Sequence, residues 1–113
     1  MIRGDNEKLL NAESDGMAMI ASFSIVPLDK GESVSEQVAE CLRIVRESGL
    51  SHRLTPMSTV IEGTSEEVMA TIMRCHAAVR SASSRVLTRI DIDDREGVSD
   101  GLVTKMRSVE SKL

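Results

Sequence analysis

Hydrophobic and polar positions change their period along the chain in a definite order. The segment Met19–Pro27 alternates between two faces, as a half-buried strand does. Pro27 is expected to end it, because proline cannot donate to a strand ladder. A second alternating segment, Val86–Asp93, is the clearest strand pattern in the chain. Between them, two shorter strands are predicted over residues 52–57 and 58–62, closed by Gly63.

Two segments have helical spacing instead, and each follows a capping-box sequence. Ser33-Val-Ser-Glu36 and Thr64-Ser-Glu-Glu67 place a hydroxyl three residues before a glutamate. Gly49 is the expected left-handed stop of the first helix. The apolar stripes are Val34, Val38, Cys41, Leu42 and Val45 in the first helix, and Val68, Ile72, Cys75 and Val79 in the second.

The order of these elements is β-α-β-β-α-β, the split βαβ plan. It predicts an α+β, ferredoxin-like fold with a four-stranded antiparallel sheet and helices on one face. A further C-terminal helix is expected over residues 98–112. Such a fold leaves the second face of the sheet uncovered, so a ligand or another copy of the chain should cover it.

The chain length of 113 residues fits one domain, which we place at residues 17–113. Residues 1–16 are rich in charge, with Leu9-Leu10 the only apolar pair. This composition is typical of a flexible extension. Met17 or Met19 could also be the true start, which would make the extension an artefact of start-site choice.

Composition excludes several classes of function. The net charge of −4 and the scattered basic residues argue against nucleic-acid binding, and Phe23 is the only aromatic side chain for base stacking. No apolar run is long enough for a membrane span, and no signal-peptide pattern is present. Cys41 and Cys75 lie in predicted helices, which indicates buried thiols in a reducing cytoplasm rather than a disulfide framework. A metal-binding pair is an alternative, but no CxxC or HxxxH partner is nearby.

Several polar groups are open to two interpretations. The aspartates at 91, 93 and 94 could hold a cation or act as acid and base, but an exposed strand end neutralised by nearby arginines is the simpler interpretation. The strand hydroxyls could line a ligand pocket or only hydrogen-bond across strands. Glu62 could stabilise a helix N-terminus or accept a bond from a ligand amine. His52 and His76 are expected at the surface or core edge, without triad partners.

Three segments together carry a resemblance to a known family. Ser22-Phe-Ser-Ile-Val-Pro27, Met57-Ser-Thr-Val-Ile-Glu-Gly63 and Val86-Leu-Thr-Arg-Ile-Asp-Ile-Asp-Asp-Arg95 occur in an order and spacing that resemble the small thiamine-binding proteins (YkoF-like). Lys105-Met-Arg-Ser-Val109 is similar to that family's C-terminus. The resemblance covers residues 17–113.

The resemblance implies a homo-oligomer, commonly a tetramer, that binds thiamine or its hydroxymethylpyrimidine half without established catalysis, metal or cofactor. The matching positions are Pro27, Ser58, Thr59, Glu62 and Asp93. Ser24 joins them because it lies on the polar side of the first strand, and Met57 or Pro27 would have to cover the ligand ring where aromatics are lacking. Ser58→Ala and Asp93→Asn are both expected to weaken pyrimidine binding.

Two other classes of function remain open at this point. One is a structural or regulatory interaction module, whose main function is to form the oligomeric sheet. The other is a small enzyme of the same fold, such as an acyl-phosphate hydrolase. That enzyme would need an arginine-bearing phosphate cradle near the first strand, where this chain has Pro27-Leu-Asp-Lys-Gly31. Fold alone does not choose among these functions.

Overall fold

The computed structural model describes residues 18–29, 35–96, 109, 110 and 112. In chain order the elements are β1 (Ala18–Pro27), α2 (Ser35–Ser48), β2 (Ser51–Leu54), β3 (Thr59–Thr64), α3 (Ser65–Ser81) and β4 (Val86–Asp94). This order confirms the predicted alternation of strands and helices.

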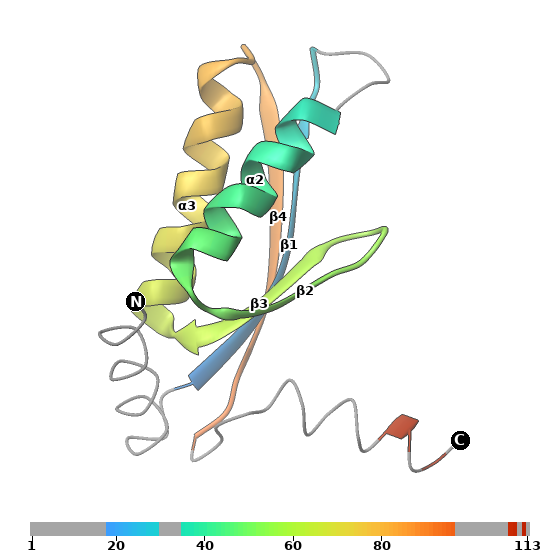
Figure 1. Ribbon diagram of the computed structural model, residues 1–113, viewed down its shortest axis with the longest axis vertical. Helices are drawn as coiled ribbons and strands as arrows, with labels where there is room; N and C mark the ends of the chain where they lie inside the picture. Colours follow the sequence, from blue (N-terminus) through green and yellow to red (C-terminus); the bar gives the residue numbers. More distant parts are fainter. Residues whose placement is uncertain (1–17, 30–34, 97–108, 111, 113) are drawn as a thin grey trace.

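The four strands form one antiparallel sheet in the order β2-β3-β1-β4. β1 is therefore central, with β3 on one side and β4 on the other (Figure 1). The two neighbours cover different lengths of β1. β3 pairs with it only as far as Phe23, whereas β4 pairs with it as far as Pro27. The last part of β1 thus has a strand partner on one side only within the described residues.

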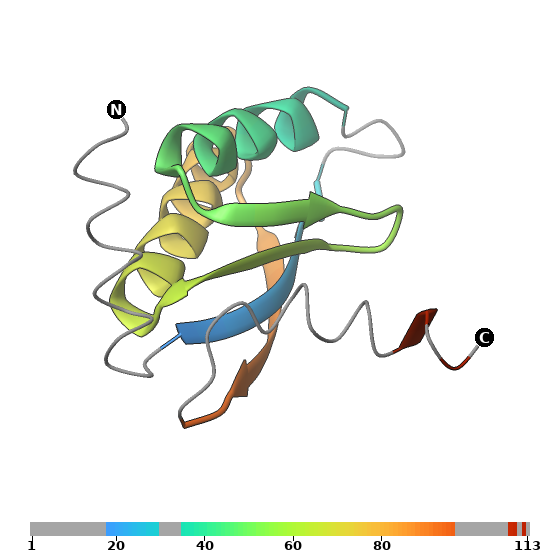
Figure 2. The same cartoon turned by 60° about the horizontal axis from the view of Figure 1, so that its bottom comes forward.

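Both helices lie on the same face of the sheet, as the pattern predicts (Figures 1 and 2). The predicted stripe of α3 is confirmed, because Val68, Ile72, Cys75 and Val79 are all buried. Val68, Ile72 and Cys75 belong to one core cluster with the inward side of β1, where Ala21 is fully buried. Burial of this apolar surface is the main stabilising contribution to the domain.

The stripe of α2 differs from the prediction. Ile44 and Val45 are its buried residues, whereas Val38 is 45% exposed and Leu42 is half-buried. The physical reason is position: part of α2 lies beside the β2–β3 hairpin rather than over the centre of the sheet (Figure 1). Its apolar side chains there line a pocket instead of filling the core.

The helix ends that the structure describes have the caps that the sequence predicts. The capping box of α3 is present: Thr64 Oγ1 accepts a hydrogen bond from Glu67 N at 3.1 Å, and Thr64 N donates to Glu67 Oε1 at 3.3 Å. Gly49 follows α2 with φ = 77°, the left-handed conformation expected of a stop. The expected cap at Ser33 lies outside the described residues, as does most of the expected helix over 98–112.

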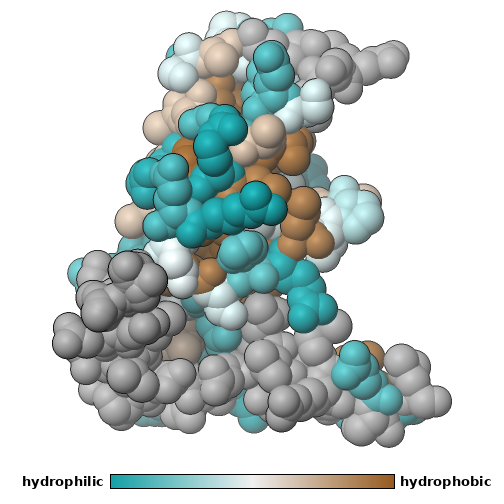
Figure 3. All heavy atoms as spheres, viewed as in Figure 1, coloured by the Kyte–Doolittle hydropathy of each residue, from teal (hydrophilic) through white to brown (hydrophobic). Residues whose placement is uncertain are grey.

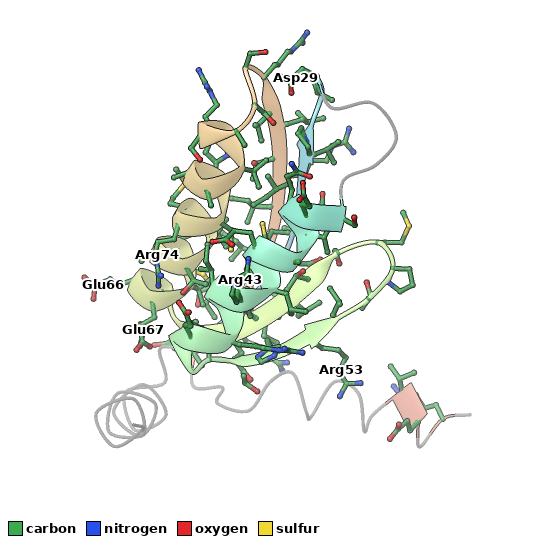
Figure 4. The ribbon with its side chains drawn as sticks, turned by 45° about the horizontal axis from the view of Figure 1, so that its top comes forward. Asp29, Arg43, Arg53, Glu66, Glu67 and Arg74 are labelled. Carbon is green, nitrogen blue, oxygen red and sulfur yellow. The ribbon has the colours of Figure 1, made fainter. Side chains whose placement is uncertain are left out.

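Gly63 has a different place from the one predicted. It does not close the hairpin but lies buried inside β3, opposite Met19, and the strand continues to Thr64. The end of β1 is held by Asp29, whose Oδ2 accepts hydrogen bonds from Ser84 N and Ser84 Oγ, each at 2.8 Å (Figure 4). These two donors lower the pKa of the exposed Asp29 carboxyl.

The sheet face opposite α2 and α3 is called the open face below. Because side chains alternate along a strand and directly paired residues share a face, register assigns its members. Arg53 is among them and projects from β2 away from the helices (Figure 4). The open-face residues are Ala18, Ile20, Ser22, Ser24, Val26, Ser51, Arg53, Val60, Glu62, Thr64, Leu87, Arg89, Asp91 and Asp93.

Candidate ligand-binding site

A pocket of about 220 Å³ lies where β1 extends beyond the end of the hairpin. The last part of β1, the Thr55–Ser58 turn and the outer side of α2 form its walls. The lining residues are Phe23, Ser24, Ile25, Val26, Val38, Cys41, Leu42, Leu54, Thr55, Pro56, Met57, Ser58 and Thr59. Since the edge of β1 next to the pocket has no strand partner here among the described residues, backbone donors and acceptors are available to a ligand.

The hairpin turn is held in one conformation by Thr55. Its Oγ1 accepts hydrogen bonds from Met57 N at 3.2 Å and Ser58 N at 3.0 Å, and donates to Ser58 O at 2.9 Å. Thr55 N also donates to Ser58 O at 2.9 Å, which closes the turn. Pro56 adds a fixed φ at the second turn position. The pocket rim is therefore built on a preorganised support.

Two hydroxyls link this rim to the central strand. Ser22 Oγ donates to Ser58 Oγ at 2.8 Å, across 36 residues of sequence. Ser58 remains half-buried and able to donate its own hydroxyl proton to another group. The cross-strand interpretation of these serines is thus confirmed for Ser22 and Ser58, and it does not exclude a ligand at Ser58.

The rest of the pocket is apolar and partly open. Its large exposed side chains are Val26 (43%), Val38 (45%), Leu54 (51%) and Met57 (85%). Figure 3 shows brown, apolar side chains at the surface of this helix-bearing side. An apolar wall with a few placed polar groups is the usual composition of a small-molecule site.

The seven site residues expected from the sequence fall into three groups. Ser24, Met57, Ser58 and Thr59 line the pocket together. Pro27 is fully buried at the end of β1 and does not line it. Glu62 and Asp93 lie on the open face, and each pairs with Ile20, so the three residues form one row across β3, β1 and β4.

The carboxylates of this row are not in the pocket. Glu62 is only 6% exposed and Asp93 is half-buried. Ser24, which lines the pocket, is further along β1 and pairs with Arg89. Asp91 shares the open face with Asp93, as the period of two predicts, and pairs with Ser22. Within the described residues, no group of three potential metal ligands occurs.

Sequence reasoning missed the part of the pocket that α2 and the turn contribute. Val38, Cys41 and Leu42 were expected in the core, and Leu54 and Thr55 were not singled out. One signal was available: the apolar positions of α2, which also include Ile44, form a stripe wider than a single buried face needs. Neither histidine belongs to the site, since His76 Nδ1 is 2.7 Å from Thr88 Oγ1 and His52 Nδ1 is 3.0 Å from Leu50 O.

A model of one protein family, described as thiamine-binding protein, matches residues 21–110. The chain belongs to the thiamine-binding protein family. The match includes every strand apart from the start of β1, both helices and the whole pocket. The resemblance that the three sequence segments indicate is therefore confirmed.

Known proteins are similar to this chain over most of its length. A UPF0045 protein of Mycobacterium bovis is 44% identical over 98 residues, which are 86% of this chain and 96% of that protein. The crystal structure of a hypothetical protein from Methanocaldococcus jannaschii has a TM-score of 0.78 at 28% identity, covering 83% of this chain and 97% of the other. A Thermotoga maritima protein, whose name proposes a role in thiamine biosynthesis or salvage, has a TM-score of 0.66 at 20% identity, covering 79% and 98%; this likeness shows the fold alone.

Within the described residues, no helix has both the length and the apolar character needed to cross a membrane.

Proposed function

We propose that the chain binds thiamine through its hydroxymethylpyrimidine half, without catalysis, and that the pocket beside the hairpin receives the pyrimidine ring. The single observation that carries the proposal is this pocket within a member of the thiamine-binding family. Hydroxyl groups line this apolar pocket together with the part of β1 that has no partner strand on this side among the described residues.

The size of the pocket favours half of the vitamin over the whole. Pockets for drug-sized ligands usually enclose roughly 300–1,000 Å³. About 220 Å³ suits a single substituted ring better than two linked rings. The thiazolium ring would then extend outward, and the net charge of −4 attracts its positive charge.

The chemistry of an aminopyrimidine fits the groups at the rim. It presents an exocyclic amine that donates and ring nitrogens that accept. Ser58 can donate and accept, and the backbone of Ser24–Val26, which β3 does not pair within the described part of the chain, supplies further groups of both kinds. Met57, 85% exposed at the tip, is an adaptable apolar cover for a ring where aromatic side chains are lacking.

We also propose that the working form is a homo-oligomer, a tetramer by family resemblance, in which open faces of different copies meet. Support comes from the half-buried apolar residues Ile20 and Val60, which lie among serines on a sheet face that neither α2 nor α3 covers. An antiparallel sheet with one uncovered, partly apolar face is stabilised by packing against another layer. The two free cysteines fit a cytoplasmic, reducing location.

Thermal shift and calorimetry with hydroxymethylpyrimidine, thiamine and inorganic phosphate test the ligand. A ligand at 100 times its Kd adds about 2.7 kcal/mol to the free energy of unfolding. We expect stabilisation by both pyrimidines and none by phosphate. Stabilisation by phosphate alone would favour an enzyme of the acyl-phosphate hydrolase type. No stabilisation by any of the three would favour an interaction module.

Ser58→Ala tests the place of binding. Removing one hydrogen bond of about 1 kcal/mol should weaken pyrimidine binding roughly fivefold. Ser81→Ala is the matched control, because Ser81 is an exposed serine at the far end of α3 whose Oγ donates to Ala78 O at 2.7 Å and which does not line the pocket. It should bind as the unchanged chain does.

Asp93→Asn tests whether the ligand binds in the pocket or at the row that Glu62, Ile20 and Asp93 form on the open face. If the ring occupies the pocket, this variant should retain pyrimidine affinity, in contrast to the expectation from sequence that both substitutions weaken binding. A loss in Asp93→Asn with normal affinity in Ser58→Ala would place the ligand at the Glu62–Asp93 row instead.

A further inference from the structure

The two cysteines of the chain come together where α2 and α3 pack. Cys41 and Cys75 are 34 residues apart, yet each sulfur approaches the backbone of the other residue. Cys41 Sγ lies 4.0 Å from Cys75 O, and Cys75 Sγ lies 3.6 Å from Cys41 O. This reciprocal arrangement requires the two helix backbones to approach closely at this one position.

The two thiols differ in access. Cys75 is completely buried in the core cluster. Cys41 is half-buried and is one of the residues that line the pocket. Cys41 is thus the less buried of the two cysteines and the one beside the pocket.

The electrostatic environment strengthens this difference. A hydrogen bond from the Cys75 thiol lowers the pKa of Cys41, although burial and the Glu40 carboxylate oppose the shift. The same hydrogen bond raises the pKa of Cys75, and burial adds to the effect. The thiolate is the nucleophile in cysteine chemistry, so Cys41 is the more reactive of the two.

Helix packing alone does not account for all of these features. A close helix crossing needs only small side chains, and alanine would meet that need without placing two thiols side by side. Here the two cysteines of the chain lie at one crossing, with Cys41 half-buried beside the pocket and Cys75 buried in the core. An accessible thiol with a second thiol nearby is the arrangement of redox-active pairs.

We propose that Cys41 and Cys75 form a redox-active dithiol, which a peroxide entering through the pocket oxidises to a disulfide between α2 and α3. The Cys41 thiolate attacks one peroxide oxygen, the O–O bond breaks, and hydroxide leaves and takes a proton to become water. Cys41 is then a sulfenic acid. The Cys75 sulfur, after losing its proton, attacks the Cys41 sulfur, and the S–O bond breaks with release of a second water. The dithiol loses two electrons, and the peroxide gains them.

The disulfide would alter the pocket because Cys41 is one of the residues that line it. A disulfide requires the sulfurs to be about 2.05 Å apart, so its formation moves the Cys41 sulfur from its place near Cys75 O to the Cys75 sulfur and changes the local packing of α2 on α3. Val38 and Leu42, which line the same pocket, are on the same stripe of α2 and would move with it. Pocket shape therefore depends on the redox state of the pair, whatever ligand the pocket binds.

Hydrogen peroxide treatment of the reduced, folded chain tests the proposal. The two thiols that react with a colorimetric reagent after unfolding should both be lost, the intact mass should fall by two hydrogen atoms, and proteolysis should release a Cys41–Cys75 linked peptide. All three changes should be reversed by a dithiol reductant. Persistence of both thiols, oxidation of Cys41 beyond sulfenic acid without a linked peptide, or links only between different chains would overturn the proposal.

Two variants make the order of events testable. In Cys75→Ala, Cys41 should stop at the sulfenic acid and be trapped by a dimedone probe. In Cys41→Ala, the remaining buried Cys75 should be unreactive until the chain is unfolded. Equal trapping at Cys75 in the folded Cys41→Ala chain would contradict the assigned roles. The linked peptide of the unchanged chain decides the proposal even if a variant folds poorly.

Discussion

Gly63 is a residue whose importance comes from the side chain it lacks. It lies buried in β3, and a Cβ built there would be 2.9 Å from Leu50 Cδ2. Leu50 is itself buried with 5% exposure, so it has little room to retreat. The glycine therefore allows the segment after α2 to pack tightly on the sheet.

Gly63→Ala should lower the free energy of unfolding by about 1–3 kcal/mol, because it overpacks a filled site. Urea denaturation of the single variant measures the change. Repeating the substitution in a Leu50→Ala background supplies the control, since the clashing atom is then absent and the added cost should be much smaller. Equal costs in both backgrounds would show that the clash with Leu50 is not the cause.

At the scale of elements, α3 is the helix that sequence defines best. Its capping box and its buried stripe are both local patterns, and both occur as predicted. α2 shows the limit of such patterns. Its apolar stripe indicates a helix correctly, but the pattern alone does not say that Val38 faces a pocket while Val45 faces the core.

Thr64→Ala should lower the free energy of unfolding by about 1 kcal/mol, because Glu67 N loses its acceptor at the start of α3. Thr64→Ser is the matched control, since it keeps the hydroxyl oxygen that accepts this bond. Chemical denaturation should therefore show a clear loss for the alanine variant and little change for the serine variant. Similar losses in both variants would mean that the methyl group of Thr64, and not its cap, is what matters.

At the scale of the whole molecule, the distribution of side chains over the two sheet faces is the decisive feature. The helix-bearing face holds a continuous apolar core. The open face mixes apolar, hydroxyl and charged side chains, and Ser22 lies near its centre on the central strand. In the proposed oligomer, this position would lie within the contact between copies.

Ser22→Arg should separate the proposed oligomer into smaller species, because a long charged side chain would be introduced into a buried sheet–sheet contact. Light scattering with size-exclusion chromatography measures the mass. Ala39→Arg, on an exposed position of α2, is the control and should leave the mass unchanged. If the unchanged chain is already a monomer, or Ser22→Arg keeps its mass while folded, the open face is not the contact.

Much of the candidate site was beyond prediction for a physical reason. Ser24, Ser58 and Thr59 could be marked as strand hydroxyls, and the structure does bring them together at the pocket. Glu62 and Asp93 could be identified as carboxylates near strand ends. Their shared pairing with Ile20 depends on the register of three strands, which the neighbouring sequence does not define. Contacts between Cys41 and Cys75 depend on the packing of two helices, which spacing in sequence does not define.

The sequence by itself determined the kind and order of the elements, because alternation, helical spacing, capping boxes and glycine stops act over a few residues. It also determined family membership through the combined order of three segments. Only the tertiary structure decided where β3 stops pairing with β1 and where α2 lies relative to the hairpin. The pocket and the cysteine pair depend on those long-range placements, since each is formed by residues that meet only when the sheet register and helix packing are complete.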